Sequence, residues 1–136
     1  AAYGNVRQLS FGMTDMAWHT LTEPFEGGVE RFEAVSMAPT QVLPVVSGTA
    51  MAPAFGHLFS GGYAAGYYGY KWAEVLEADA FSLFKEKGIF NREVASSFRE
   101  NVLSKGGTEH PMELYVRFRG HKPETKALIE KMGLGK

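Results

Sequence analysis

"FGHLFSGGYAAGYYGYKWAEVL", residues 55–76, is the stretch on which the interpretation of this chain depends. Its first sixteen positions hold one histidine, five glycines and four tyrosines, and an ordinary amphipathic pattern follows from Trp72. A glycine inside regular structure costs roughly 1 kcal/mol relative to alanine, because its flexible backbone loses more entropy on folding. Such a cluster is therefore typical of a segment whose backbone approaches another group closely.

The backbone of this stretch is open to two interpretations. Three tyrosines are spaced as on one face of a helix, beside a stripe of three glycines: Tyr63, Tyr67 and Tyr70, and Gly62, Gly66 and Gly69. In a loop that leads into the helix of Trp72, the same tyrosines would converge near the helix start. Both arrangements offer protonated phenol donors together with the imidazole of His57. The pattern alone favours a purely structural explanation, because tyrosines often line the edge of a core and small residues allow close helix packing.

Outward from this stretch, proline and glycine punctuation predicts a chain made almost entirely of helices. The expected helices are 6–21, 28–37, 72–88, one capped by Asn91 that stops at "KGG", 111–120 and 123–133. Apolar spacing puts Leu9, Met13 and Met16 on one face of the first helix, and Val29, Phe32 and Val35 on the buried side of the second. Residues 39–53 carry three prolines and are expected to form an extended connection or one short strand.

Composition limits the class of protein. With 136 residues and 45% apolar content, the chain is long enough for one sizeable core and one globular unit. The net charge is −1 and the basic residues are scattered, so no nucleic-acid partner is expected. There is no cysteine, which excludes disulfides and thiolate ligands. No run has the length of a membrane span and the first residues lack the regions of a signal peptide, so no membrane partner is expected.

The residues alone provide no complete catalytic machine. The chain lacks H-E-x-x-H, G-x-S-x-G and the phosphate-binding P-loop pattern. Outside the glycine stretch, His19, His110 and His121 are expected to be structural or surface residues, with His110 at a helix start. The carboxylates of the long helix are expected on its polar face: Glu74, Glu77 and Asp79.

Three stretches resemble one family. "FGHLFSGGYAAGYYGYKWAEVLEADAFSLF" resembles the segment that follows the zinc site in the thimet oligopeptidase family of zinc metallopeptidases, which includes oligopeptidase A and bacterial peptidyl-dipeptidase. The resemblance continues through "GIFNREVASSFRENVLSKGGTEHP" toward what looks like the C-terminus of that family, and backward through "RQLSFGMTDMAWHTL". It covers nearly the whole chain, and the His-Gly-Tyr cluster together with "LSKGGTEHP" makes it specific.

The resemblance implies an all-α fold in which residues 1–136 form a single helical unit, the C-terminal portion of a larger, mostly helical zinc peptidase. The H-E-x-x-H helix and the third glutamate ligand of the family lie upstream of the portion represented here, and this chain has neither. The implied zinc therefore belongs to the parent enzyme. No zinc is expected in this fragment, and the isolated chain is expected to be inactive.

The resemblance also implies roles for the Gly/Tyr-rich stretch, which would form a substrate-facing loop. Tyr70 is expected to be a catalytic donor to the oxyanion, and the expected substrate-binding residues are His57, Tyr63, Tyr67, Gly61 and Gly62. Neutral donors fixed in a dry cleft stabilise an oxyanion more strongly than the ground-state carbonyl.

The implied partners are a short peptide substrate and the missing N-terminal portion of the same enzyme, in the cytoplasm. A fragment of this kind should leave the surface of Leu9, Met13, Met16 and the early tyrosines partly uncovered, and self-association would follow. The alternative is a noncatalytic helical module that binds peptides or serves as a scaffold.

Overall fold

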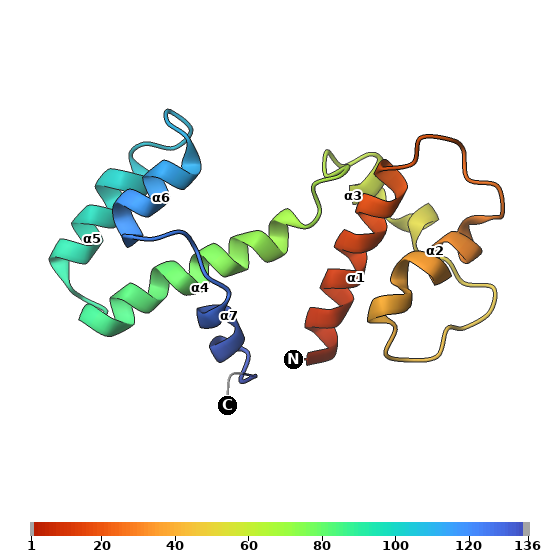
Figure 1. Ribbon diagram of the computed structural model, residues 1–136, viewed down its shortest axis with the longest axis horizontal. Coiled ribbons are helices and arrows are strands. Elements are labelled where there is room, and N and C mark those ends of the chain that lie inside the picture. Colours follow the sequence, from red (N-terminus) through yellow and green to blue (C-terminus); the bar gives the residue numbers. More distant parts are fainter. Residues whose placement is uncertain (1, 135–136) are drawn as a thin grey trace. The chain divides into compact units, whose positions relative to one another are not determined.

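Helices account for the regular secondary structure between residues 2 and 134, which is the part of the chain that the computed structural model describes (Figure 1). The predicted all-α fold is confirmed for these residues, because no strand occurs among them. The chain divides into two compact units, Ala1–Lys71 and Trp72–Lys136. The single helical unit expected over residues 1–136 stays a prediction.

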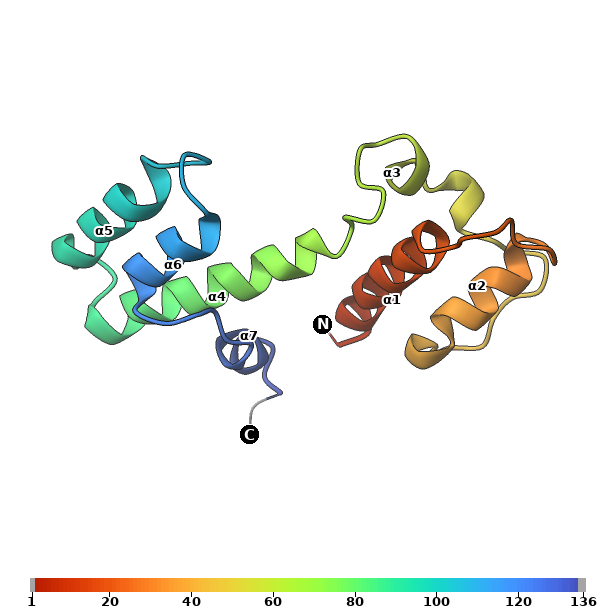
Figure 2. The same cartoon turned by 45° about the horizontal axis from the view of Figure 1, so that its top comes forward.

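In the first unit, α1 (Ala2–His19) and α2 (Val29–Met37) lie side by side (Figure 2). The rings of Trp18 and Phe32 stack with their centroids 3.7 Å apart, and Phe25 packs edge-on against both. This aromatic contact brings the loop between the two helices back onto them, because stacked and edge-on ring pairs add to the free energy gained by burial.

The buried side of α1 consists of small and polar residues. Ser10, Gly12, Thr14 and Asp15 are buried. The Thr14 hydroxyl lies 3.4 Å from that of Ser36 on α2, and the Asp15 carboxylate accepts bonds from a distant loop. The apolar face described from the sequence remains open, with Leu9, Met13 and Met16 respectively 49%, 39% and 37% exposed. The expectation that this chain leaves that face partly uncovered is confirmed.

The buried side of α2 differs from the predicted one. Phe32 is buried as expected, but Val35 is exposed and Glu33 is buried in its place. The Glu33 carboxylate accepts hydrogen bonds from the backbone N–H groups of Met51, at 2.8 Å, and Ala52. These bonds turn the Glu33 side of α2 toward the segment that follows the helix. A buried carboxylate is tolerated here because its oxygens have donors.

The segment after α2 forms no strand within the described residues. Two single turns of 3₁₀ helix, η1 (Ala38–Thr40) and η2 (Ala52–Ala54), interrupt an otherwise irregular connection, which leads into the short helix α3 (Gly56–Phe59). Both 3₁₀ turns carry a proline at their start. Proline fixes φ near the helical value but cannot donate to a ladder, so these residues favour turns over a strand.

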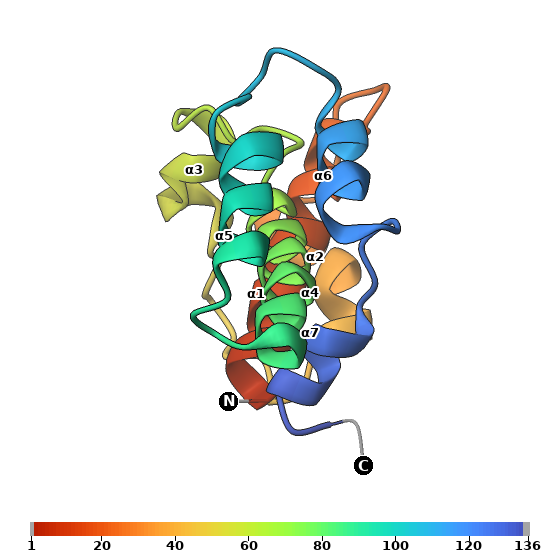
Figure 3. The same cartoon turned by 90° about the vertical axis from the view of Figure 1, so that its left-hand side faces the viewer.

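The helix α4 (Gly69–Lys87) begins in the first unit and continues through the second. There it is followed by α5 (Arg92–Phe98), a π-helical turn η3 (Arg99–Leu103), α6 (Pro111–Arg119) and α7 (Lys126–Lys131). The helices α4, α5 and α6 run beside one another (Figure 3), and aromatic rings from all three are in contact. The centroid of Phe84 lies 6.1 Å from that of Phe98 and 6.2 Å from that of Phe118, which are themselves 5.1 Å apart.

The helix ends of the second unit largely follow the sequence signals. The Asn91 side chain accepts bonds from the N–H groups of Glu93 and Val94 and caps α5, as predicted. Gly120 ends α6 in the left-handed conformation. The last helix begins at Lys126, three residues later than predicted from Pro123.

The predicted position of Asp79 on the polar face of the long helix is wrong. Asp79 is buried, and its Oδ2 atom accepts a 2.6 Å hydrogen bond from the Tyr115 hydroxyl of α6. The Arg119 Nε atom donates to the Asp79 backbone carbonyl at 3.0 Å and lies 3.6 Å from the carboxylate. Donors supplied by a neighbouring helix make this buried charge tolerable.

Among residues 2–134, no helix combines the length and the apolar content that a membrane crossing requires.

Candidate functional site

His57, Tyr63, Tyr67 and Tyr70 gather in the first unit, and we call them the tyrosine cluster. His57 lies on α3, Tyr63 and Tyr67 lie in the loop 60–68, and Tyr70 lies in the first turn of α4. The rings of Tyr63 and Tyr70 stack at 5.2 Å between centroids, and those of Tyr67 and Tyr70 lie 5.0 Å apart. The His57 ring lies 5.5 Å from Tyr63 and 6.1 Å from Tyr67. The four rings therefore form one continuous group.

Of the two backbone arrangements open from the sequence, the loop is the one that forms. Turns follow one another before α4, with hydrogen bonds from Gly66 N to Tyr63 O at 2.8 Å and from Gly69 N to Gly66 O at 3.0 Å. Gly62 has φ = +77°, a conformation that glycine adopts without steric cost. The tyrosines thus converge at the start of α4, although the chain between them is not helical.

Gly61 allows the loop to fold back on α3. A Cβ atom at this position would lie 2.9 Å from the Cα atom of His57 and 3.3 Å from the carbonyl oxygen of Gly56. Real Cβ atoms essentially never approach backbone at the shorter of these distances. The close approach that the glycine cluster predicts is therefore present, and the group approached is the helix that carries His57. A contact of Gly61 or Gly62 with substrate stays a prediction.

Asp15 on α1 binds the backbone of the loop 60–68, a role that was not predicted from the sequence. Its side chain is fully buried, with Oδ1 accepting from Ala65 N at 3.0 Å and Oδ2 accepting from Tyr67 N at 2.9 Å. The Nδ1 atom of His19 lies 2.8 Å from Oδ1. The one local signal was the i, i+4 spacing of Asp15 and His19. Nothing local indicated that the donors would come from a loop 50 residues away.

Ala65 adopts an uncommon backbone conformation within this loop. Its φ of +53° makes it the one described non-glycine residue with positive φ. The left-handed conformation costs an alanine roughly 1–2 kcal/mol, so it persists only where surrounding contacts impose it. The hydrogen bond from Ala65 N to Asp15 is one such contact.

The cluster combines an anchored ring with accessible ones. Tyr67 is buried, and its ring packs against those of Phe11, at 6.0 Å, and Phe55, at 5.0 Å. Tyr63 and Tyr70 are 38% and 42% exposed. A hydrogen bond with Tyr63 raises the pKa of the Tyr70 hydroxyl above its ordinary value, and desolvation and the neighbouring phenols raise this pKa further. Tyr70 is therefore a neutral donor at neutral pH.

The described part of the chain does not bring metal-ligand side chains together. Among residues 2–134, three or more histidine, aspartate or glutamate side chains nowhere gather closely enough to hold a metal ion. The histidines have separate surroundings. His19 pairs with Asp15, and His110 caps α6 by accepting from Met112 N at 3.2 Å, as expected for a helix start.

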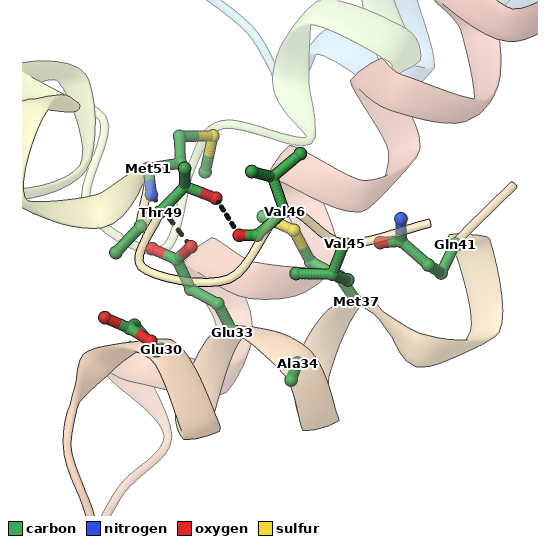
Figure 4. A pocket seen from close by; sticks show the side chains of 10 residues that line it. Glu30, Glu33, Ala34, Met37, Gln41, Val45, Val46, Thr49 and Met51 are labelled. Carbon is green, nitrogen blue, oxygen red and sulfur yellow. Dashed lines mark hydrogen bonds between the residues drawn. The ribbon is translucent and has the colours of Figure 1, made fainter. Parts of the chain in front are cut away.

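A pocket of about 420 Å³ lies beside α2 and includes no member of the tyrosine cluster (Figure 4). One wall is the exposed edge of α2, and the other is the irregular connection, where the Thr49 hydroxyl donates to the Val46 carbonyl at 2.6 Å. Glu33 points toward Met51 and is occupied with holding that connection. The lining residues are Glu30, Glu33, Ala34, Met37, Gln41, Val45, Val46, Thr49, Ala50 and Met51.

Comparison with known proteins now identifies the family. A sequence model described as "Peptidase family M3" matches residues 1–134. The chain belongs to peptidase family M3. The resemblance carried by the glycine and tyrosine motif is thereby confirmed.

Several M3 relatives are closely similar over nearly the whole chain. Oligopeptidase A of Escherichia coli is 47% identical over 136 residues, which are 98% of this chain and 20% of that protein. A protein of Arabidopsis thaliana named "Probable cytosolic oligopeptidase A" is 41% identical over 137 residues, 96% of this chain and 19% of the relative. A dipeptidyl carboxypeptidase of Salmonella typhimurium is 36% identical over 134 residues, which are 97% of this chain and 20% of that protein. The chain spans about a fifth of the length of these relatives.

Proposed function

We propose that this M3 chain forms the substrate-binding wall of a zinc-dependent oligopeptidase or peptidyl-dipeptidase, in which the tyrosine cluster holds a short peptide by its backbone. One observation carries the proposal: three phenols and an imidazole converge over a glycine-rich loop, in a chain that belongs to a peptidase family. If these tyrosines served only to pack the edge of the core, their rings would not need to be accessible to a ligand. Tyr63 and Tyr70 are both accessible.

The chemistry of the cluster suits hydrolysis of a peptide bond. Attack on the carbonyl carbon develops negative charge on the carbonyl oxygen, and fixed donors aimed at that oxygen stabilise the transition state more than the ground state. Each phenol has one O–H donor. The raised pKa of Tyr70 means that its O–H donates to Tyr63, so this proton leaves that bond when Tyr70 turns to a substrate oxygen. In this proposal Tyr70 supplies the bond to the oxyanion.

The remaining members of the site position the substrate. Tyr63 and His57 contact the peptide backbone beside the scissile bond. Tyr67 lines the same site, and its ring keeps those of His57 and Tyr70 in place. Gly61 and Gly62 leave the loop surface free of side chains, so an extended peptide can lie against it. Binding of an extended peptide in a fixed pose lowers the entropic part of the barrier.

Zinc enters this proposal as a component of the parent enzyme. The residues of this chain do not fit a zinc site of their own, because no three histidine, aspartate or glutamate side chains among residues 2–134 lie close enough together to bind one ion. We therefore assign the zinc ligands to the N-terminal portion of the parent and assign only substrate binding and oxyanion stabilisation to this chain. The isolated chain is accordingly inactive. A cytosolic location is proposed by analogy with the Arabidopsis relative.

The proposal is tested by Tyr70→Phe in the full-length parent enzyme. The substitution removes one hydroxyl and keeps the ring stacked on Tyr63. We expect kcat to fall by roughly 10²–10³, with KM nearly unchanged, because the lost bond forms mainly in the transition state. Steady-state kinetics on a short peptide, with zinc content and thermal unfolding measured in parallel, give the answer.

Tyr68→Phe is the matched control. Tyr68 lies in the same loop, is 57% exposed, and loses the same atom on substitution. We expect the activity of this variant to equal that of the unmodified enzyme. If a folded, zinc-loaded Tyr70→Phe enzyme keeps both kcat and KM, the cluster is a packing feature and the proposal is wrong. Peptide binding without turnover in the intact parent would instead support the noncatalytic module.

A further inference from the structure

We propose that Asp15 is a positioning residue for the reaction, which fixes the tyrosine cluster from beneath the loop by accepting two backbone hydrogen bonds. This inference rests on the proposed function of the cluster. Asp15 itself contacts no substrate, since its side chain is fully buried. Its effect on the reaction would pass through the loop.

The geometry ties both carboxylate oxygens to the loop. Oδ1 accepts from Ala65 N at 3.0 Å and Oδ2 accepts from Tyr67 N at 2.9 Å, so a single side chain holds two alternate residues of the same turn. Hydrogen bonds to an ionised acceptor are stronger than those between neutral groups. The loop also lies directly on the helix that carries Asp15, because an added Cβ at Gly12 would be in ordinary van der Waals contact with the Cα of Tyr68, at 3.5 Å.

The position of Tyr67 is passed on to Tyr70. The Tyr70 N–H donates to the Tyr67 carbonyl at 3.3 Å, and the two rings lie 5.0 Å apart. The ring of Tyr70 in turn stacks on that of Tyr63. A shift of Tyr67 toward or away from α1 would therefore move the phenols that the proposed function assigns to the substrate.

A carboxylate satisfies both loop donors at once, because the two backbone N–H groups each face one of its oxygens. His19 Nδ1 lies 2.8 Å from Oδ1, but it also lies 2.8 Å from the Asp15 backbone carbonyl, which any residue at this position would keep. An asparagine at this position has a single acceptor oxygen, and its NH₂ group would face one of the donors. A buried donor left without an acceptor would be expected to move, and the movement would occur in the loop because α1 is held by its own hydrogen bonds.

Glu33 provides a matched control within the same unit. It is also a buried carboxylate on a helix, and it also accepts two backbone N–H bonds from a distant loop segment, at Met51 and Ala52. It differs in that it holds Met51 and Ala52, in the connection before α3, and neither of these two bonds goes to the loop 60–68. Glu33→Gln therefore reproduces the structural loss of Asp15→Asn without disturbing the turn that carries Tyr67.

The first test compares these two variants in the full-length enzyme. We expect both to lower the melting temperature. Asp15→Asn should also lower kcat by about tenfold to a hundredfold, as expected for a misplaced donor, whereas Glu33→Gln should leave kcat within about twofold of the unmodified enzyme. Equal effects of the two variants on kcat would overturn the inference, because general destabilisation would then explain both.

The second test is a double-mutant cycle with Tyr70→Phe. If Asp15 acts by placing the Tyr70 hydroxyl, Asp15→Asn should cost much less activity in an enzyme that already lacks this hydroxyl. A full, multiplicative loss would show that Asp15 acts by another route. If Tyr70→Phe alone has no effect, it is the proposed function that fails, so the two failures are distinguishable.

A measurement on the unmodified enzyme covers the case in which Asp15→Asn does not fold. Hydrogen exchange should show slow exchange in the peptide that contains the Ala65 and Tyr67 amides, although the loop surface is exposed. Fast exchange there, at the rate of an unstructured loop, would overturn the inference directly.

Discussion

Gly61 sets the separation between the Gly/Tyr-rich loop and the helix that carries His57. The sequence showed that close backbone approach was required in this stretch, and the structure shows which backbone is approached. A Cβ atom added at Gly61 would lie 2.9 Å from the Cα atom of His57. This Cα belongs to the backbone of α3, so α3 would have to shift to make room. The requirement for glycine at this position is therefore internal to the site and arises before any ligand is bound.

Gly61→Ala should consequently displace His57 from the tyrosine cluster. We expect kcat/KM of the parent enzyme to fall by about tenfold or more, because small errors in placement are costly to an oriented site. Gly66→Ala is the control: its added Cβ would meet its nearest neighbour at 3.5 Å, an ordinary contact. Steady-state kinetics on both variants decide the matter, and equal activities would show that the loop adapts to a side chain at position 61.

At the same scale, three buried carboxylates mark the limit of what the sequence predicts. Asp15, Glu33 and Asp79 each sit on a helix where sequence pattern favours exposure, and each is buried. Their donors lie at Ala65 and Tyr67, at Met51 and Ala52, and at Tyr115, which is 18 to 52 residues away along the chain. Tyr67 and Tyr70 were identifiable from their spacing, but the residue that holds their loop was not, because its partners are defined only by tertiary contact.

At the scale of elements, local signals are sufficient for most helix boundaries. Asn91 caps α5 and Gly120 ends α6 where the sequence indicated, because both act on backbone groups within a few residues. Exposure of Val35 on α2 was not predictable from periodicity, since the position of Glu33 is set by a segment of the chain outside the helix. Neighbouring residues thus determine where a helix forms, whereas contacts with distant residues determine which side of the helix is buried.

The contact between α4 and α6 has a testable pH dependence. Burial, the hydrogen bond to Asp79 and the charge of Asp79 raise the pKa of Tyr115 above its ordinary value of about 10. Because the folded state retains the proton more tightly, the stability that this group contributes is complete below pH about 10 and declines as the pH rises further.

Tyr115→Phe should therefore flatten the alkaline limb of the stability curve. Above pH about 10, the free energy of unfolding of the unmodified chain should fall by about 1.4 kcal/mol per pH unit relative to the variant. Urea unfolding at a series of pH values measures this difference, and Tyr3→Phe, an exposed tyrosine of α1, serves as the control. Parallel curves for the unmodified chain and Tyr115→Phe would show that the phenol ionises in the folded state as easily as in the unfolded one.

At the scale of the whole molecule, each of the two units has its own buried residues. Leu58, Phe32 and Tyr67 are among those of the first unit, and the second packs Val75 and Ala78 against Leu128. The first unit also leaves a row of apolar side chains open on α1, at Leu9, Met13 and Met16. Their spacing of three and four residues puts these side chains on one face of α1, the arrangement expected where another protein surface covers a helix.

The last prediction is that the isolated 136-residue chain associates with itself through this face of α1. Burial of the exposed apolar area in a contact between copies is favourable, and the chain offers no large net charge to oppose it, since its formal charge is −1. Replacing Leu9 and Met13 by lysine should weaken the association strongly while keeping the helix, because lysine is a good helix former. Leu103→Lys changes a leucine of the second unit that is more exposed than Leu9, and it should leave the association unchanged. Sedimentation velocity over a range of concentrations, with circular dichroism to confirm helicity, distinguishes the variants, and a helical chain that stays monomeric throughout would contradict the prediction.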